Sequence, residues 1–153
     1  MEGTHLAHLV DEFRGLIASS HPAEDPAVSR LVPDAYPEDP DASAAFAEST
    51  QAELLDRRER DAAVVRTALE AFTAPLENED DATAPLDVVI PDADLDAWLR
   101  TLSAMRLVMA SRLGIDADDD HDPEDPRYAV YDWLGYRLDG LITATQDDEG
   151  TGV

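Results

Sequence analysis

Three side chains near the start of the sequence have types and a spacing that could hold a metal ion. His5, His8 and Glu12 follow one another at i, i+3 and i+7, which places them on one side of a helix. Imidazole and carboxylate groups form zinc sites when a further ligand completes the set. Without a fourth ligand from elsewhere in the sequence, the pattern favours a solvated polar face, opposite the apolar face of the same helix, over a metal centre.

A second candidate is the acidic segment at residues 116–125, DADDDHDPED. Asp116, Asp118 and Asp120 have the spacing of the first ligands of a calcium loop. His121 occupies the position that needs Gly, and Arg127 the position that needs a bidentate Glu. The pattern therefore argues against a specific calcium loop, with weak cation binding as the alternative, and indicates no cofactor.

Arg106 is the charged residue whose place in the sequence is the least expected. A rotation of ~100° per residue over 92–113 places Arg106 inside the apolar face of that helix. A guanidinium stays charged, so we expect it to be largely buried and bound to a carboxylate. Asp61 is the first candidate, because it too falls within an apolar face, and Asp34 and Asp132 follow. The alternative is an anion site in a cleft.

The remaining chemistry of the sequence does not support an enzyme. There is no Cys, and neither a nucleophile elbow nor a Gly-rich phosphate loop occurs. Arg57, Arg58 and Arg60 could receive an anion, but their acidic neighbours favour ion pairs within one helix. Paired carboxylates are too common in this chain to indicate acid–base catalysis.

The elements that would hold these residues are helices. Residues 25–40, DPAVSRLVPDAYPEDP, hold four prolines, of which Pro26 and Pro40 follow an aspartate as N1 prolines do. We therefore expect a packed corner and not a linker. Thr50 and Glu53 have the spacing of a capping box, which predicts that a new helix begins there. The expected helices are 4–19, a short turn from 26, an Ala-rich segment 40–49, 50 to about 75, 92–113 and 125 to about 144.

Helix 92–113 should lie at the centre. It begins after Pro91 and ends at Gly114, and it is apolar around much of its girth. The sequence thus predicts an all-α, single-domain bundle of four to six helices, with one short extended segment at 86–90 as a further option. We expect the domain to span residues 1–146 and the tail at 147–153 to be disordered.

Charge limits the partners of the chain. It has 35 acidic and 11 basic residues, all Arg, and a formal net charge of −24. Such a surface repels nucleic acid and anionic lipid. The N-terminal segment lacks the basic region of a signal peptide, and no stretch reaches membrane-spanning length. We expect a cytoplasmic protein with no nucleic acid and no membrane partner.

Aromatic residues are the candidate anchors for a protein partner. Trp98 lies inside the apolar arc of helix 92–113 and should be core. Trp133 projects toward the edge of the last helix's arc. If exposed, Trp133 and Tyr136 would be contacts for a partner or for a second copy in a homodimer, and Tyr36 is a further candidate.

Three blocks of the sequence resemble a family of actinobacterial proteins, the domain of unknown function number twenty-seventeen. They are DPAVSRLVPDAYPEDP at 25–40, AWLRTLSAMRLVMASRLGI at 97–115 and AVYDWLGYRL at 129–138. The resemblance implies no catalytic residues. It implies a gene neighbourhood with the Clp protease adaptor, a JAMM-type metallopeptidase, a small sulfur-carrier protein and a cysteine synthase.

The predicted function is a helical interaction or regulatory module, linked to Clp-dependent proteolysis or to sulfur transfer through that neighbourhood. The alternatives are a small hydrolase or ligand-binding enzyme, and an acidic DNA mimic. A deep pocket lined by carboxylates of shifted pKa would favour the enzyme, whereas a flat apolar patch would favour the module.

Overall fold

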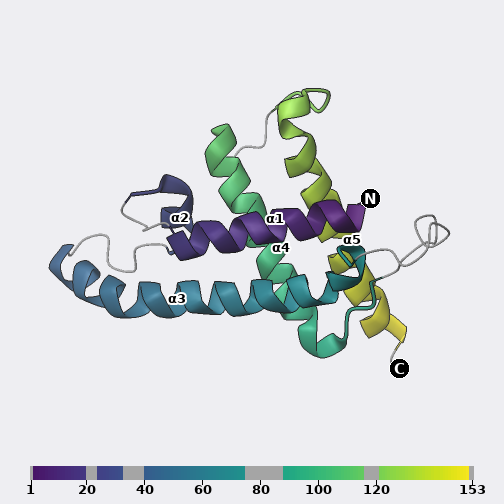
Figure 1. Cartoon of the computed structure of the whole chain (residues 1–153), viewed down its shortest axis with the longest axis horizontal. Helices are drawn as coiled ribbons and strands as arrows, with labels where there is room; N and C mark the ends of the chain where they lie inside the picture. Colours follow the sequence, from purple (N-terminus) through teal and green to yellow (C-terminus); the bar gives the residue numbers. More distant parts are fainter. Residues whose placement is uncertain (1, 20–23, 33–39, 75–87, 116–120, 152–153) are drawn as a thin grey trace.

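The computed structural model describes residues 2–19, 24–32, 40–74, 88–115 and 121–151, with no side chains for 40–49 and 148–151 (Figure 1). The elements are α1 (Glu2–Ser19), α2 (Pro26–Leu31), α3 (Pro40–Ala68), η1 (Glu70–Phe72), α4 (Asp92–Leu113), η3 (Pro126–Tyr128) and α5 (Ala129–Thr151). Within these ranges there is no strand. The all-α prediction is therefore confirmed.

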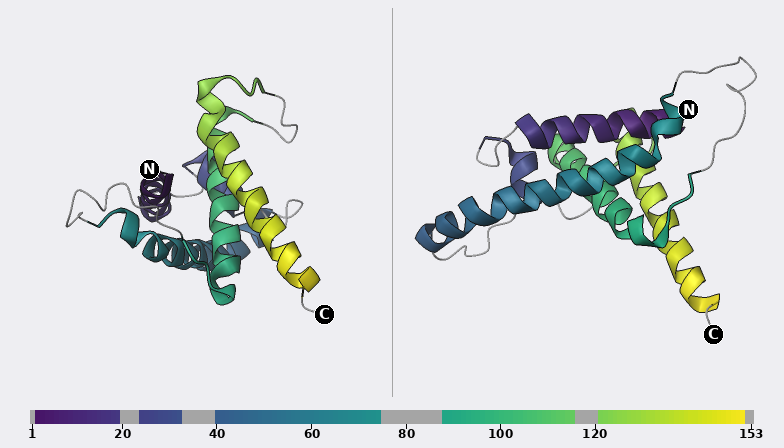
Figure 2. Two further views of the ribbon diagram at one scale, coloured as in Figure 1. Left: turned by 90° about the vertical axis from the view of Figure 1, so that its right-hand side faces the viewer. Right: turned by 60° about the horizontal axis from the view of Figure 1, so that its bottom comes forward.

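The helices form two crossing pairs. α1 and α3 run antiparallel side by side, and α4 crosses both of them (Figure 1). α5 lies antiparallel beside α4, and the short α2 packs against α4 (Figure 2). α4 thus contacts α2, α3 and α5, which is the central position predicted from its wide apolar surface.

Local signals set several helix ends as the sequence predicts. The Asp25 carboxylate accepts the Ala27 N–H at 2.9 Å, and Pro26 follows it as the first residue of α2. Asp125 and Pro126 repeat this arrangement before η3. At the other end of α4, Gly114 has φ 72°, where glycine carries no Cβ penalty. The Ile115 N–H returns to the Ala110 carbonyl at 2.9 Å, which completes a Schellman motif.

Two other boundaries differ from prediction. α3 runs without interruption from Pro40 to Ala68, so the helix expected to begin at Thr50 is wrong. No Pro or Gly separates the two segments. The spacing of Thr50 and Glu53 is that of a capping box, but the same spacing also occurs inside a continuous helix, so it does not by itself mark a helix start. At 88–90, the described part of the optional extended segment, no strand is present.

The last helix also extends further than the sequence indicates. α5 ends at Thr151 and thereby includes most of the segment for which we expected disorder. The polar residues after Ala144 include no proline, so each can add one hydrogen bond to a helix that has already formed.

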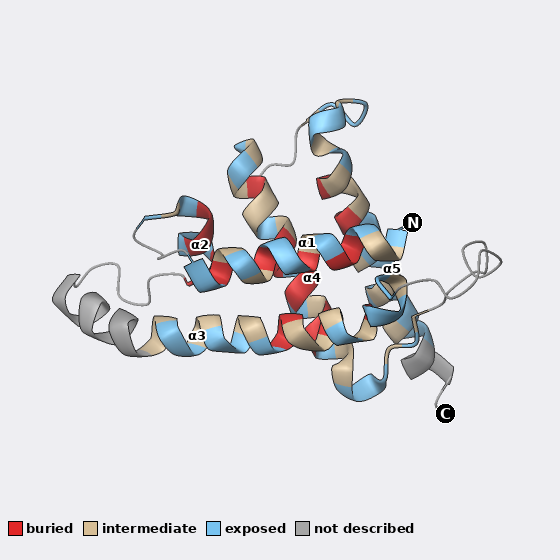
Figure 3. Ribbon diagram, in the orientation of Figure 1, coloured by how far each residue is buried: buried red, intermediate tan, exposed pale blue. Residues whose placement is uncertain are grey.

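The core lies where α1 and α3 cross α4 (Figure 3). From α4, Trp98 is buried there as predicted, together with Leu102 and Met105, each at most 4% exposed. Small residues of α4 are buried beside them, namely Ala97, Thr101, Ala104 and Ala110. Because small side chains allow helices to approach closely, α4 is buried on several sides and not along one stripe. Along the described residues, no helix is long and apolar enough to cross a membrane.

Arginine–carboxylate pairs join the helices across the core. The pairs are Arg14–Glu59 between α1 and α3, Arg66–Asp11 between α3 and α1, Arg100–Asp61 between α4 and α3, and Arg112–Asp25 between α4 and α2. The distances between the paired nitrogen and oxygen atoms are 2.6 to 2.9 Å. The α1–α3, α3–α4 and α2–α4 contacts therefore each have a charged pair at their margin.

The Arg112–Asp25 pair makes the docking of α2 depend on pH. The hydrogen bond from Arg112 is the main cause that lowers the pKa of Asp25 below its ordinary value of 3.8, helped by the backbone N–H of Ala27. A carboxylate with a lowered pKa in the folded state contributes stability above its unfolded pKa, and this contribution is lost as the pH falls through the folded pKa.

We therefore expect Arg112→Gln to be less stable than the wild type near pH 6, and the gap in free energy of unfolding to narrow as the pH falls below about 4. Denaturant titrations at a series of pH values measure the free energy of unfolding of each protein, and thus the gap and its change with pH. Arg30→Gln, an exposed residue of α2, removes the same charge and should show no such narrowing. A gap that stays constant for Arg112→Gln would contradict the assignment.

Candidate functional site

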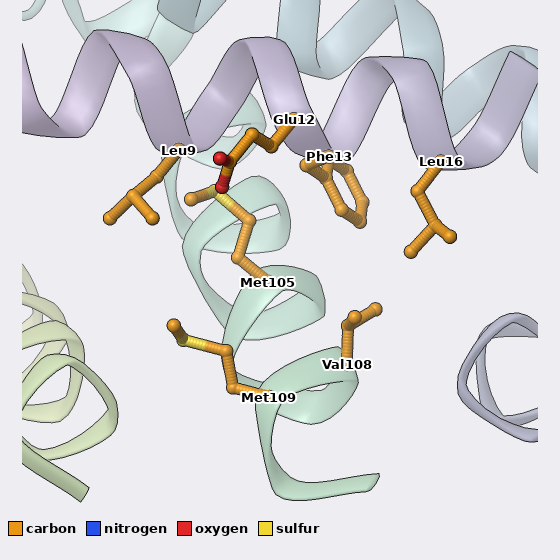
Figure 4. A pocket seen from close by; sticks show the side chains of 7 residues that line it. All are labelled: Leu9, Glu12, Phe13, Leu16, Met105, Val108 and Met109. Carbon is orange, nitrogen blue, oxygen red and sulfur yellow. The ribbon is translucent and has the colours of Figure 1, made fainter. Parts of the chain in front are cut away.

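An apolar groove lies in the corner where α1 crosses α4. It is lined by Leu9, Glu12, Phe13 and Leu16 from α1 and by Met105, Val108 and Met109 from α4, and its volume is about 110 Å³. In Figure 4, Leu9, Phe13 and Leu16 of α1 and Met105 and Val108 of α4 project into the space between the two helices. We call this surface the α1–α4 groove.

The groove exists because each helix has more apolar surface than the other can cover. Leu9, Phe13 and Leu16 follow one another at i, i+4 and i+7, and Met105, Val108 and Met109 at i, i+3 and i+4. Phe13 and Met105 are buried, whereas the other four are half-buried. Crossing helices touch over a short length, so the stripes of both helices continue beyond the contact.

This surface was not predicted. By helical periodicity Leu9, Leu16 and Met109 fall within the apolar arcs of their helices, as Phe13 and Met105 do. What separates them from Phe13 and Met105 is the direction of the crossing, which periodicity does not give. The sequence signal that could have indicated the groove is that α1 and α4 each have an apolar stripe wider than one helix contact covers.

The candidate metal ligands do not form a site. His5, His8 and Glu12 are all exposed along α1. Among the residues that the structure describes, no group of three or more His, Cys, Asp or Glu side chains could hold a metal ion. Asp116, Asp118 and Asp120 lie outside the described residues.

Asp61 and Asp132, two of the three predicted partners of Arg106, are each bound by another residue. The Arg106 guanidinium lies over the Tyr131 ring, 4.1 Å from the ring centroid, and the side chain is half-buried. Asp61 is instead bound by Arg100, at 2.8 Å from Nε and 3.2 Å from Nη2, and Asp132 by His121 at 2.8 Å. Asp34 lies outside the described residues.

The cause is that the apolar arc of α4 faces different neighbours on different sides. Arg100 and Arg106 are six residues apart, so they point about 120° apart on the helix. Arg100 faces α3, where Asp61 is, and Arg106 faces α5. Gly135 of α5 makes room for Arg106, since a Cβ there would lie 3.0 Å from its Nε.

The arginine cluster of α3 also differs from expectation. Glu59, an acidic neighbour of these arginines, binds Arg14 of α1, and Asp61 binds Arg100 of α4. Burial is the main cause that lowers the pKa of Arg58, while Arg57 and Arg60 are exposed. Glu59 and Asp61 therefore join α3 to α1 and to α4.

The aromatic residues divide as the apolar arcs indicate. Trp98 is 4% exposed and belongs to the core. Trp133 is half-buried, and its indole N–H donates to the Glu2 carboxylate at 3.1 Å. Tyr136 is 71% exposed. Tyr36, the third candidate contact, lies outside the described residues.

A shallow hollow of about 410 Å³ lies beside Trp133, where the start of α1 meets α5. It is lined by Glu2, His5, Ala129, Val130 and Trp133. Glu2 is already engaged there, because it also accepts a hydrogen bond from Arg137. The Arg137 guanidinium lies near two aromatic rings, 5.9 Å from the centroid of Trp133 and 5.8 Å from that of Tyr136.

The shifted titratable groups do not lie in either hollow. Hydrogen bonds to arginine lower the pKa of Asp25 and of Asp125, and hydrogen bonds to carboxylates raise the pKa of Arg14, Arg100 and Arg127. Of the described residues whose pKa is shifted, none lines the α1–α4 groove or the hollow beside Trp133. The described lining of the groove is apolar except for Glu12.

Comparisons with known proteins give one match. The model of the family described as Domain of unknown function (DUF2017) matches residues 1–145. No curated protein and no solved structure matches the chain.

The different exposure of the two α5 aromatics predicts different effects on stability. We expect Trp133→Ala to lower the free energy of unfolding by about 1–3 kcal/mol, because it removes a half-buried indole and its hydrogen bond to Glu2. Tyr136→Ala should change it by less than about 0.5 kcal/mol. Light scattering gives the molar mass of both variants in solution. If Tyr136 made a contact between two copies, Tyr136→Ala would have a lower mass than the wild type, whereas a role in packing alone would leave the mass unchanged.

The fit between Gly135 and Arg106 predicts a difference between two glycines of α5. No atom lies within 4 Å of a Cβ added at Gly140, so Gly140→Ala should raise the free energy of unfolding by about 0.5–1 kcal/mol through helix propensity. Gly135→Ala should gain less or lose stability, because Arg106 must shift from the Tyr131 ring. Equal gains in thermal or urea unfolding would show that Arg106 is not held there.

Proposed function

Because the chain belongs to the DUF2017 family, a domain of unknown function, we propose a function from its own geometry. It is a cytoplasmic helical interaction module that binds one amphipathic helix of a partner protein in the α1–α4 groove. The observation that carries the proposal is the pair of half-buried apolar stripes that meet in this corner.

The spacing of the lining residues suits a helix as the occupant. Helices that bind in apolar grooves present anchors at i, i+3 or i+4 and i+7. The α1 wall presents its apolar residues at i, i+4 and i+7, and the α4 wall at i, i+3 and i+4. A third helix laid in the corner would therefore contact an apolar stripe on each side. From Leu9 to Leu16 the α1 wall is about 10 Å long, which corresponds to two helical turns.

The size of the groove favours side chains over a small molecule. Its volume of about 110 Å³ lies below the range of about 300–1,000 Å³ that is typical of small-molecule sites. It also lies below the volume of about 150 Å³ of a cavity that holds benzene. One or two aliphatic side chains of a helix match this space. Met105 and Met109 adapt to such anchors, because methionine side chains are unbranched and flexible.

The family's gene neighbourhood suggests which partners to test first. The Clp protease adaptor and the small sulfur-carrier protein are the two that would link the module to regulated proteolysis or to cysteine synthesis. A module of this kind would act by holding or covering a helix of its partner, and it would need no reaction centre of its own.

The sequence supplies a direct probe of the groove. Its three methionines are Met1, Met105 and Met109, of which the last two line the groove. In protein labelled with carbon-13 at the methionine methyl groups, a partner helix in the groove should shift the signals of Met105 and Met109 and leave that of Met1. The titrants are the purified Clp adaptor and, separately, the sulfur-carrier protein.

Two adjacent residues of α4 provide the matched variants. Val108→Glu places a charge in the groove and should reduce binding by about tenfold or more, since it desolvates a carboxylate against the partner's apolar face. Leu107→Glu makes the same change at a residue that is 37% exposed and outside the groove, and it should bind as the wild type does. Equal binding by both variants would contradict the groove as the docking surface.

A further inference from the structure

Glu12 is the one charged residue among those that line the α1–α4 groove. It is exposed, and it projects from α1 between Leu9 and Phe13 (Figure 4). Within the described ranges, no hydrogen bond or ion pair engages its carboxylate. The groove therefore offers an apolar floor with one negative charge at its edge.

The cations on the two walls of the groove are used elsewhere. α1 and α4 contain four arginines, namely Arg14, Arg100, Arg106 and Arg112. Arg14 binds Glu59 of α3, Arg100 binds Asp61 of α3, and Arg112 binds Asp25 beside α2. Arg106 lies on the Tyr131 ring of α5. Each of the four thus faces a neighbouring helix, and the edge of the groove keeps its negative charge.

The whole chain reinforces this local charge. With a formal net charge of −24 and no Lys, its surface potential attracts cationic segments over a distance and repels acidic ones. Attraction of this kind raises association rates and discriminates between partners more than it raises affinity.

From these observations we infer that the helix bound in the α1–α4 groove is basic, with Lys or Arg beside its apolar stripe, and that Glu12 pairs with one of these residues. The inference rests on the proposed function and adds the charge of the partner to it. Apolar anchors supply the contact, and the acidic edge rejects helices whose polar flanks are acidic.

Two synthetic peptides of about 16 residues test the inference directly. Both carry the same Leu residues at i, i+3 or i+4 and i+7, and their polar positions are Lys in one peptide and Glu in the other. Each is titrated into methionine-labelled protein at low salt and at about 0.5 M salt. We expect the Lys peptide to shift Met105 and Met109, leave Met1, and bind about tenfold more tightly than the Glu peptide at low salt.

Charge reversal at one position localises the effect. Glu12→Lys should weaken binding of the Lys peptide by about fivefold or more, because it replaces an attraction by a repulsion. Glu53→Lys makes the same change at an exposed residue of α3, outside the groove, and should weaken binding by less than about twofold. Circular dichroism checks that both variants remain helical, and Glu12→Gln serves if the reversal disturbs folding.

The outcomes separate the inference from the proposal on which it rests. Equal affinity of the two peptides, with shifts at Met105 and Met109, would overturn the basic partner and leave the docking groove. Equal effects of Glu12→Lys and Glu53→Lys would reduce the preference to general attraction and overturn the role of Glu12. If neither peptide shifts the signals of Met105 and Met109, both the inference and the proposed function are overturned. Both are also overturned if these signals shift with protein concentration alone, because a second copy of the chain would then fill the groove.

Discussion

The burial of α4 on more than one side is the constraint on which the rest of the structure depends. Trp98, Leu102 and Met105 are almost completely buried where α4 crosses α1 and α3, and Ala97, Ala104 and Ala110 let other neighbours approach the same helix. A helix in this position cannot be covered by one antiparallel partner. α1 and α3 therefore cross it, α5 lies along it, and the six residues of α2 cover part of the remaining surface.

A chain with this much negative charge must offset repulsion between its helices. Several of its 11 arginines form pairs that cross from one helix to another, at Glu59, Asp11, Asp61 and Asp25. Arginine suits this use, because its planar fork holds a carboxylate through two hydrogen bonds, as Arg100 does with Asp61. Because these arginines lie at contacts between helices, the outer surface remains acidic.

The features that follow from neighbouring residues were predictable, and those that follow from packing were not. Asp25 with Pro26, Asp125 with Pro126, and Gly114 act within one turn of chain, so the sequence is sufficient to place those helix ends. The partner of Arg106 depends on which side of α4 faces α5, and periodicity along one helix contains no such information. The α1–α4 groove was missed for the same reason, because the crossing direction decides whether Leu9 and Leu16 become core or edge.

α2 shows how α4 accepts a short amphipathic helix. Ala27, Val28 and Leu31 pack against α4 with at most 1% exposure, and the capping residue Asp25 binds Arg112 of α4. Apolar contact and one charged pair at the margin are thus sufficient to dock six residues on this helix when the chain itself brings them close. The α1–α4 groove has the same two components, with the carboxylate on the groove side in place of the guanidinium. A segment docked in the groove must therefore supply the cation. Unlike α2, a segment of another protein is not held close by the chain itself, so it must be longer than α2 and contact the apolar stripes of both walls.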